Sequence, residues 1–110
     1  MRKRVYIAGP MSIGDRVDNL NMALRAMRDL TIHGFAPLSP QLTFFIANVL
    51  RFDHDTWIQI DLPWVSQADA ILRLPGESKG ADEEVKTAIQ YNVPVFSSIE
   101  KLKQHFRSKP

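Results

Sequence analysis

The stretch AILRLPGESKGADEEVKTAIQY, residues 70–91, decides the fold. Its first five residues, 70–74, form a short and mostly apolar run, which predicts a buried strand. A loop with two glycines follows at 75–80, and we expect a helix over 81–91. A strand, a loop and a helix in this order begin a βαβ unit, in which the next strand runs parallel to the first. The stretch therefore predicts a parallel α/β sheet.

The rest of the chain continues this alternation of strands and helices. Further strands are expected at 5–8, 35–38 and 93–96, and further helices at 18–33, 55–65 and 99–106. Asp18 and Asp55 are the expected N-caps, and Gly34 is the expected stop of its helix. Pro63 should kink or restart the helix in which it lies, because its ring removes one backbone donor. We expect one α/β domain over residues 1–110, with a parallel sheet of four to five strands covered on both faces.

One segment, residues 41–54, has no assigned element. Its apolar residues, too many for an exposed loop, are Leu42, Phe44, Phe45, Ile46, Val49 and Leu50. A helix packed on the core, a lid over a pocket and a contact to a second subunit would each explain them. A domain of 110 residues buries only part of its surface. We therefore expect a homodimer or a larger homo-oligomer.

Composition and charge narrow the class of protein. The net charge is +2 and the pI about 9.2, but the basic residues are scattered apart from clusters near both termini. Such clusters are typical of a solvated surface, so we expect no nucleic-acid partner. The absence of cysteine excludes disulfides, thiolate zinc sites and a cysteine nucleophile. No apolar run approaches the roughly 20 residues of a membrane span, so we expect a cytoplasmic protein without a membrane partner.

Two loops and one helix start form the candidate ligand site. Ligands of parallel sheets bind beyond the carboxyl ends of the strands, where the loops at 9–12 and 76–80 are expected. Both loops contain small residues that let backbone N–H groups approach an anion. Three consecutive carboxylates at 82–84 follow the second loop about 100° apart around the helix, so one or two of them can face a pocket. Asp61 is a further candidate, since it is a charge on a largely apolar helix, where a structural cap or an ion pair is the alternative explanation.

Three blocks of sequence stand out when the chain is followed from its start. They are Tyr6-Ile7-Ala8-Gly9-Pro10-Met11, Asp61-Leu62-Pro63-Trp64-Val65-Ser66-Gln67-Ala68-Asp69, and Ser78-x-Gly80-x-x-x-Glu84 followed by Ala88. Together they resemble the nucleoside 2-deoxyribosyltransferase superfamily, and the resemblance runs from Tyr6 to about Phe96. This superfamily includes deoxynucleoside 5′-monophosphate N-glycosidases and cytidine-monophosphate hydrolases. The resemblance implies a flavodoxin-like doubly wound sheet, a dimer or larger assembly, and a nucleoside or nucleotide as the ligand.

The resemblance also implies cleavage of an N-glycosidic bond through a covalent sugar–enzyme intermediate. The nucleophile of the serine–glycine motif falls on Glu84, and the tyrosine that holds this carboxylate falls on Tyr6. The aspartate that contacts the sugar or assists the leaving base falls on Asp61. The residues expected to line the sugar and any 5′-phosphate are Gly9, Pro10, Met11, Ser78, Lys79 and Gly80. A carboxylate near C1′ suits this chemistry because the transition state resembles an oxocarbenium ion. We expect neither a cofactor nor a metal ion.

Two residues depart from the family's pattern. Pro63 interrupts the Asp-Leu-x-Trp block, and Lys79 stands in a loop that often has a neutral residue. Lys79 is expected to add a phosphate contact and so to favour 5′-monophosphates. Hydrolysis and base transfer both remain open, because either water or a second base can take the sugar from Glu84. The alternative is a nucleotide-binding module without turnover on the same fold, but the presence of Tyr6, Asp61 and Glu84 together favours an enzyme.

Overall fold

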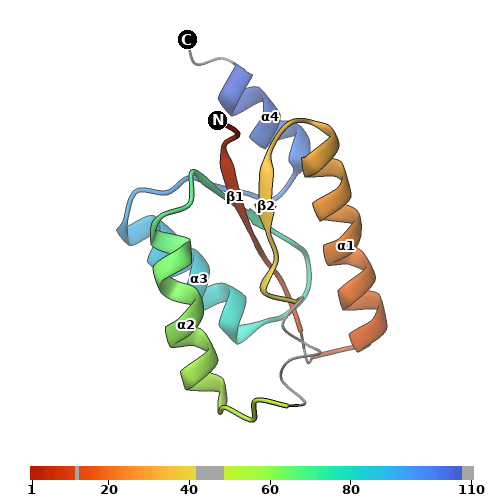
Figure 1. Ribbon diagram of the computed structural model, residues 1–110, viewed down its shortest axis with the longest axis vertical. Helices are drawn as coiled ribbons and strands as arrows, with labels where there is room; N and C mark the ends of the chain where they lie inside the picture. Colours follow the sequence, from red (N-terminus) through yellow and green to blue (C-terminus); the bar gives the residue numbers. More distant parts are fainter. Residues whose placement is uncertain (12, 42–48, 108–110) are drawn as a thin grey trace.

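The computed structural model describes residues 1–11, 13–41 and 49–107. The elements follow one another as β1 (Arg4–Ala8), α1 (Arg16–Ile32), β2 (Ala36–Leu38), α2 (His54–Ser66), β3 (Ala70–Arg73), α3 (Lys79–Gln90), β4 (Val95–Phe96) and α4 (Ile99–Arg107). Within the described residues, four strands form one sheet in the order β2-β1-β3-β4, and every neighbouring pair is parallel (Figure 1). This order matches the first four strands of the flavodoxin-like doubly wound fold, so the predicted parallel α/β fold is confirmed.

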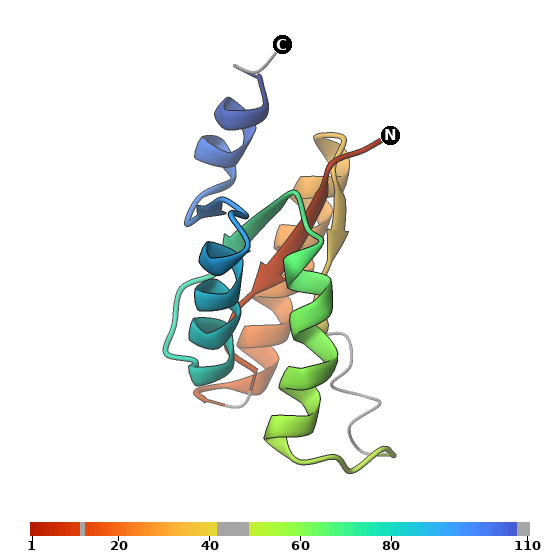
Figure 2. The ribbon, with the colours of Figure 1, turned by 90° about the vertical axis from the view of Figure 1, so that its left-hand side faces the viewer.

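The side chains of β1 alternate between the two faces of the sheet. Val5 and Ile7 join the core beneath α1 and α4, whereas Tyr6 and Ala8 join the core beneath α2 and α3. Figure 2 shows α1 behind the sheet and both α2 and α3 in front of it. All four of these side chains are at most 2% exposed. The strand is therefore buried on both faces, as the continuous apolar run of a parallel sheet requires.

The ends of α1 show one wrong prediction and one confirmed one. The cap is Asp15, whose Oδ1 accepts the backbone N–H groups of Val17 and Asp18 at 2.9 and 3.1 Å. Asp18 is therefore a first-turn residue, because its own backbone N–H is one of the donors that the cap satisfies. The predicted stop at Gly34 is confirmed. Gly34 has φ +89°, and the backbone N–H of Phe35 returns to the Leu30 carbonyl at 2.9 Å.

The starts of α2 and α3 also lie earlier than the sequence predicts. Asp53 caps α2 by accepting the N–H of Thr56 at 2.8 Å, so Asp55 is a first-turn acid. Ser78 caps α3 by accepting the N–H of Ala81 at 3.1 Å, so this helix starts at Lys79 rather than Ala81. In each case a polar residue with extended backbone lies just upstream of the expected start, and it accepts an N–H of the first turn.

Pro63 does not end or restart α2, which is one helix over His54–Ser66. The residue four positions earlier, Gln59, loses its helical N–H partner, but both residues are exposed, so water can satisfy the carbonyl. The prediction of a restart is therefore wrong. Of the apolar residues named for segment 41–54, Val49 and Leu50 are exposed, and the other four lie outside the described residues.

The candidate site lies at one end of the molecule. The carboxyl ends of the parallel strands and the N-terminal ends of α1, α2 and α3 meet at the lower end of Figure 1. The face of the sheet beneath α2 and α3 carries Tyr6 to this end.

Candidate active site

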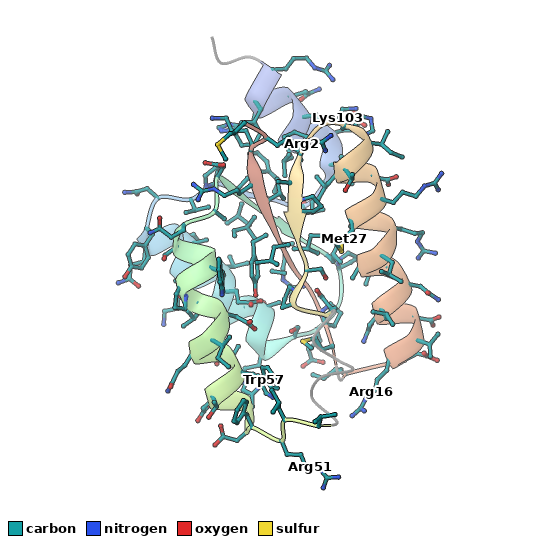
Figure 3. The ribbon with its side chains drawn as sticks, viewed as in Figure 1. Arg2, Arg16, Met27, Arg51, Trp57 and Lys103 are labelled. Carbon is teal, nitrogen blue, oxygen red and sulfur yellow. The ribbon has the colours of Figure 1, made fainter. Side chains whose placement is uncertain are left out.

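A cavity lies between α2 and α3 beyond the carboxyl end of β1. The four residues that α2 contributes, His54, Trp57, Ile58 and Asp61, are spaced i, i+3, i+4 and i+7 and so share one helical face. The remaining lining residues are Gly9, Met11, Ile13, Pro40, Glu77, Ser78, Lys79, Gly80, Ala81 and Glu84. Figure 3 shows Trp57 at the same end of the molecule as Arg16 and Arg51. The cavity therefore has two helical walls and a floor made by the loop after β1.

Glu84 and Tyr6 form a buried pair at this cavity. Glu84 is 4% exposed and Tyr6 2% exposed. The Tyr6 hydroxyl donates a hydrogen bond to Oε2 of Glu84. A side chain of α3 is thus fixed by a side chain of β1, 78 residues away along the chain. This hydrogen bond orients one carboxylate oxygen and leaves the other available to a ligand.

Burial controls the protonation of this pair. Burial raises the pKa of Glu84 to about 8; the hydrogen bond from Tyr6 opposes the rise, the charge of Asp61 adds to it, and that of Arg73 opposes it. Burial, together with the charges of Glu84 and Asp61, also raises the pKa of Tyr6 far above its usual range. Tyr6 is therefore a permanent hydrogen-bond donor, while Glu84 exchanges a proton near neutral pH.

Asp61 is the second carboxylate of the cavity. It lies on the α2 wall, and burial raises its pKa to about 6. Its charge raises the pKa values of both Tyr6 and Glu84, so the three groups share one electrostatic environment. The structure thus brings together the three residues that the sequence proposes for chemistry.

Five of the six residues expected to bind the substrate line the cavity. They are Gly9, Met11, Ser78, Lys79 and Gly80. Pro10 lies outside the lining and packs instead against Gly76, where an added Cβ would come within 2.9 Å of its Cγ. Gly76 has φ +113°, so this position favours glycine for its backbone as well as for the close contact.

Packing alone gives a reason for glycine at two positions of the lining. A Cβ at Gly9 would lie 3.0 Å from Cβ of Leu74. A Cβ at Gly80 would lie 3.2 Å from Cδ1 of Ile58 and 3.4 Å from Cε1 of His54. The same small residues that let a ligand approach the backbone therefore also let the walls of the cavity close together.

Arg73 holds the loop that leads into α3. Its guanidinium donates to the carbonyls of Leu74 and Gly76, the latter at 2.9 Å, and pairs with Asp82 at 3.2 Å. Asp82 is thereby turned outward, while Glu84 points into the cavity. Of the three consecutive acids, only Glu84 contributes to the lining.

The sequence analysis missed two aromatic residues of the α2 wall. Neither His54 nor Trp57 was assigned a role from the sequence. Their spacing with Ile58 and Asp61 was visible in the sequence, but a helical face can meet either a core or a cavity. Among the residues that the structure describes, no group of three or more His, Asp or Glu side chains is placed to hold a metal ion.

Two basic residues near the termini have structural partners at the opposite end of the molecule, where Figure 3 labels Arg2 and Lys103. Arg2 donates to the carbonyls of Thr31 and Phe35, both at 3.0 Å, and so satisfies backbone groups after α1. Lys103 pairs with Glu100 at 3.5 Å. None of the helices in the described part of the chain is both long and apolar enough to span a membrane.

The fold and this cavity define a parallel α/β protein with a buried tyrosine–glutamate pair at the carboxyl end of its sheet. The chain belongs to the family described as "Domain of unknown function (DUF4406)", whose model matches residues 3–97. No curated protein matches the chain.

A solved structure shares the fold. It is a 2-deoxyribosyltransferase from Bacillus psychrosaccharolyticus, described as a biocatalyst for the synthesis of nucleosides. The two chains are 20% identical, the match covers 84% of this chain and 69% of the other, and the TM-score is 0.62. The fold that the sequence resemblance implies is therefore confirmed.

Proposed function

We propose that this protein cleaves the N-glycosidic bond of a nucleoside or nucleoside 5′-monophosphate. The observation that carries the proposal is the buried Tyr6–Glu84 pair, whose Glu84 lines the same cavity as Asp61. A retaining glycosidase needs two carboxyl groups, one as the nucleophile and one as the acid. The shared fold with a 2-deoxyribosyltransferase is consistent with a nucleoside ligand.

Glu84 acts as the nucleophile. One carboxylate oxygen attacks C1′ as the bond from C1′ to the base breaks, and the bonding electrons leave with the base nitrogen. Tyr6 holds the other oxygen of Glu84 by its hydrogen bond and so fixes the direction of attack. Asp61 donates its proton to the leaving base.

The second half of the reaction reverses these roles. Asp61, now ionised, takes a proton from water or from a second base as this nucleophile attacks C1′. The bond from C1′ to Glu84 breaks and the carboxylate is restored. With water the product is a free sugar, and with a second base it is a new nucleoside.

The pKa values of the two carboxyls restrict the active form of the enzyme. The reaction needs Glu84 ionised and Asp61 protonated, but their pKa values of about 8 and about 6 favour the opposite state. Because the pKa of Glu84 lies above that of Asp61, only a minor share of the singly protonated molecules is in the active form. The rate should still follow a bell-shaped curve, since the singly protonated pair predominates between about pH 6 and pH 8.

We also expect the protein to act as a homodimer or larger assembly. An apolar groove between α2 and β2 is lined in part by Leu38, Pro63 and Trp64. Trp64 is 61% exposed and Leu38 46% exposed, which leaves apolar surface for a second copy to cover.

Free base is the product that tests the proposal. The protein should release base from at least one member of a panel of deoxynucleosides, ribonucleosides and their 5′-monophosphates, with Glu84→Ala as the control. A ligand that binds but is never cleaved would instead support a nucleotide-binding module.

A further inference from the structure

The α2 wall of the cavity changes along its length from a carboxylate to an aromatic ring. Asp61 is its acid, and Trp57 lies one turn closer to the start of the helix, about 6 Å away along the axis. Exposure rises in the same direction, since Trp57 is half-buried and His54 is exposed. A group that starts at Asp61 and extends toward the mouth of the cavity therefore passes along Trp57.

The indole ring of Trp57 is held in place by a neighbouring ring. Its centroid lies 5.4 Å from that of Phe52, at an interplanar angle of 63°. Such an edge-to-face pair restrains the ring, so less conformational freedom is lost when a ligand stacks on it. Trp57 nevertheless belongs to the cavity lining, which a purely structural ring pair would not require.

The opposite wall comes close to α2 near Gly80. A Cβ added to Gly80 would lie 3.2 Å from Cδ1 of Ile58 and 3.4 Å from Cε1 of His54, so the two walls touch at this point. Because Gly80 has no side chain, it adds no atoms between the two walls. Trp57 takes no part in this contact, so its ring remains available to a ligand in the cavity.

We propose that Trp57 is the stacking surface for the base of the substrate, with the sugar over Glu84. This inference rests on the proposed function, since it takes the ligand to be a nucleoside or nucleotide. The base nitrogen bonded to C1′ then faces Asp61, and the rest of the ring extends along α2 over Trp57. Stacking of a base on an aromatic side chain contributes roughly 5- to 150-fold in affinity and tolerates different bases.

The two tryptophans of the chain allow a direct test by fluorescence. Trp64 lines the separate groove at β2 and lies about 10 Å from Trp57 along the helix axis. In a Glu84→Gln background, which blocks turnover, Trp64→Phe leaves only Trp57 emission and Trp57→Phe leaves only Trp64 emission. Both proteins are titrated with 2′-deoxyadenosine, 2′-deoxycytidine and their 5′-monophosphates, and 2-deoxyribose 5-phosphate is the control without a base.

Saturable quenching of Trp57 emission by the base-containing ligands, with unchanged Trp64 emission, is the expected result. Trp57→Ala should weaken binding by roughly 5- to 150-fold, whereas Trp57→Phe should retain most of the affinity. Quenching of Trp64 alone, equal quenching of both, no quenching, or unweakened binding to Trp57→Ala would each overturn the inference.

Base release is measured in parallel on Trp64→Phe with Glu84 intact, so that the two proposals can be told apart. Base release without Trp57 quenching overturns the stacking site and leaves the proposed function standing. Quenching of Trp57 without base release supports the stacking site and overturns the proposed reaction.

Discussion

Replacing Glu84 by glutamine should stabilise the folded protein, and increasingly so as the pH rises. The pKa of this carboxyl is about 8 in the folded protein, against an ordinary value of 4.5. Below pH 4.5 the folded and unfolded chains both hold the proton, so it does not affect stability. Between the two pKa values only the unfolded chain releases it, so stability falls with rising pH and levels off above about pH 8.

The size of this effect follows from the same two pKa values. One pH unit corresponds to about 1.4 kcal/mol, so at pH 7 the buried carboxyl destabilises the folded protein by roughly 3 kcal/mol. Little of this is screened by solvent, because Glu84 is only 4% exposed. Glutamine keeps the shape and an oxygen that can accept the Tyr6 hydroxyl but cannot ionise. The melting temperature at pH 7 should therefore rise by roughly 10–20 °C.

Thermal unfolding followed by circular dichroism between pH 4 and pH 8.5 measures this directly. Parent and Glu84→Gln should melt at similar temperatures near pH 4 and diverge as the pH rises. Glu83→Gln is the matched control, since it removes the same charge from the neighbouring, less buried residue and should not reproduce the divergence. Parallel curves for the parent and Glu84→Gln would refute the claim that burial controls the protonation of Glu84.

Three further predictions concern activity. Asp61→Asn should lower the rate by roughly 10²–10⁴-fold and turn the bell-shaped pH profile into a curve that rises to a plateau, because only Glu84 then titrates; an unchanged bell would show that Asp61 is not the acid. The parent should have a higher kcat/KM for 5′-monophosphates than for free nucleosides, and Lys79→Ala should remove this difference. Equal values for both substrates in the parent would contradict a phosphate contact. Arg73→Ala should shift the upper limb of the pH profile to higher pH, since the positive charge of Arg73 lowers the pKa of Glu84, and Arg73→Lys should restore part of the shift. An upper limb unchanged in Arg73→Ala would mean that Arg73 acts only on the structure of the loop.

The alternation of strands and helices was predictable because it depends on local patterns. Residues 5–8 and 70–74 are short apolar runs, and each is followed by a glycine-containing turn that separates it from the next helix. Helix starts were less predictable, since Asp15 and Asp18 can both accept backbone N–H groups and only the backbone conformation decides between them. The placement of the cap is a matter of about one turn of helix, which leaves the fold unchanged.

The site needed information that local patterns do not contain. The contact between Tyr6 and Glu84 spans 78 residues and was expected only from the family resemblance. The aromatic wall at His54 and Trp57 escaped notice because an apolar helical face indicates burial but not what it faces. Whether such a face meets the core or a cavity depends on how α2 and α3 pack at the end of the sheet, and the spacing along one helix does not determine that.

Acid-quenched mass spectrometry can show whether Glu84 carries the sugar during the reaction. The protein is mixed with the panel of nucleosides and 5′-monophosphates, quenched within milliseconds to seconds, and digested for peptide analysis. We predict that at least one substrate leaves a mass increase equal to its sugar on the peptide that contains Glu84, with free base released and no adduct on Glu84→Ala. Base release without an adduct on Glu84, and at an undiminished rate in Glu84→Ala, would show that Glu84 is not the nucleophile.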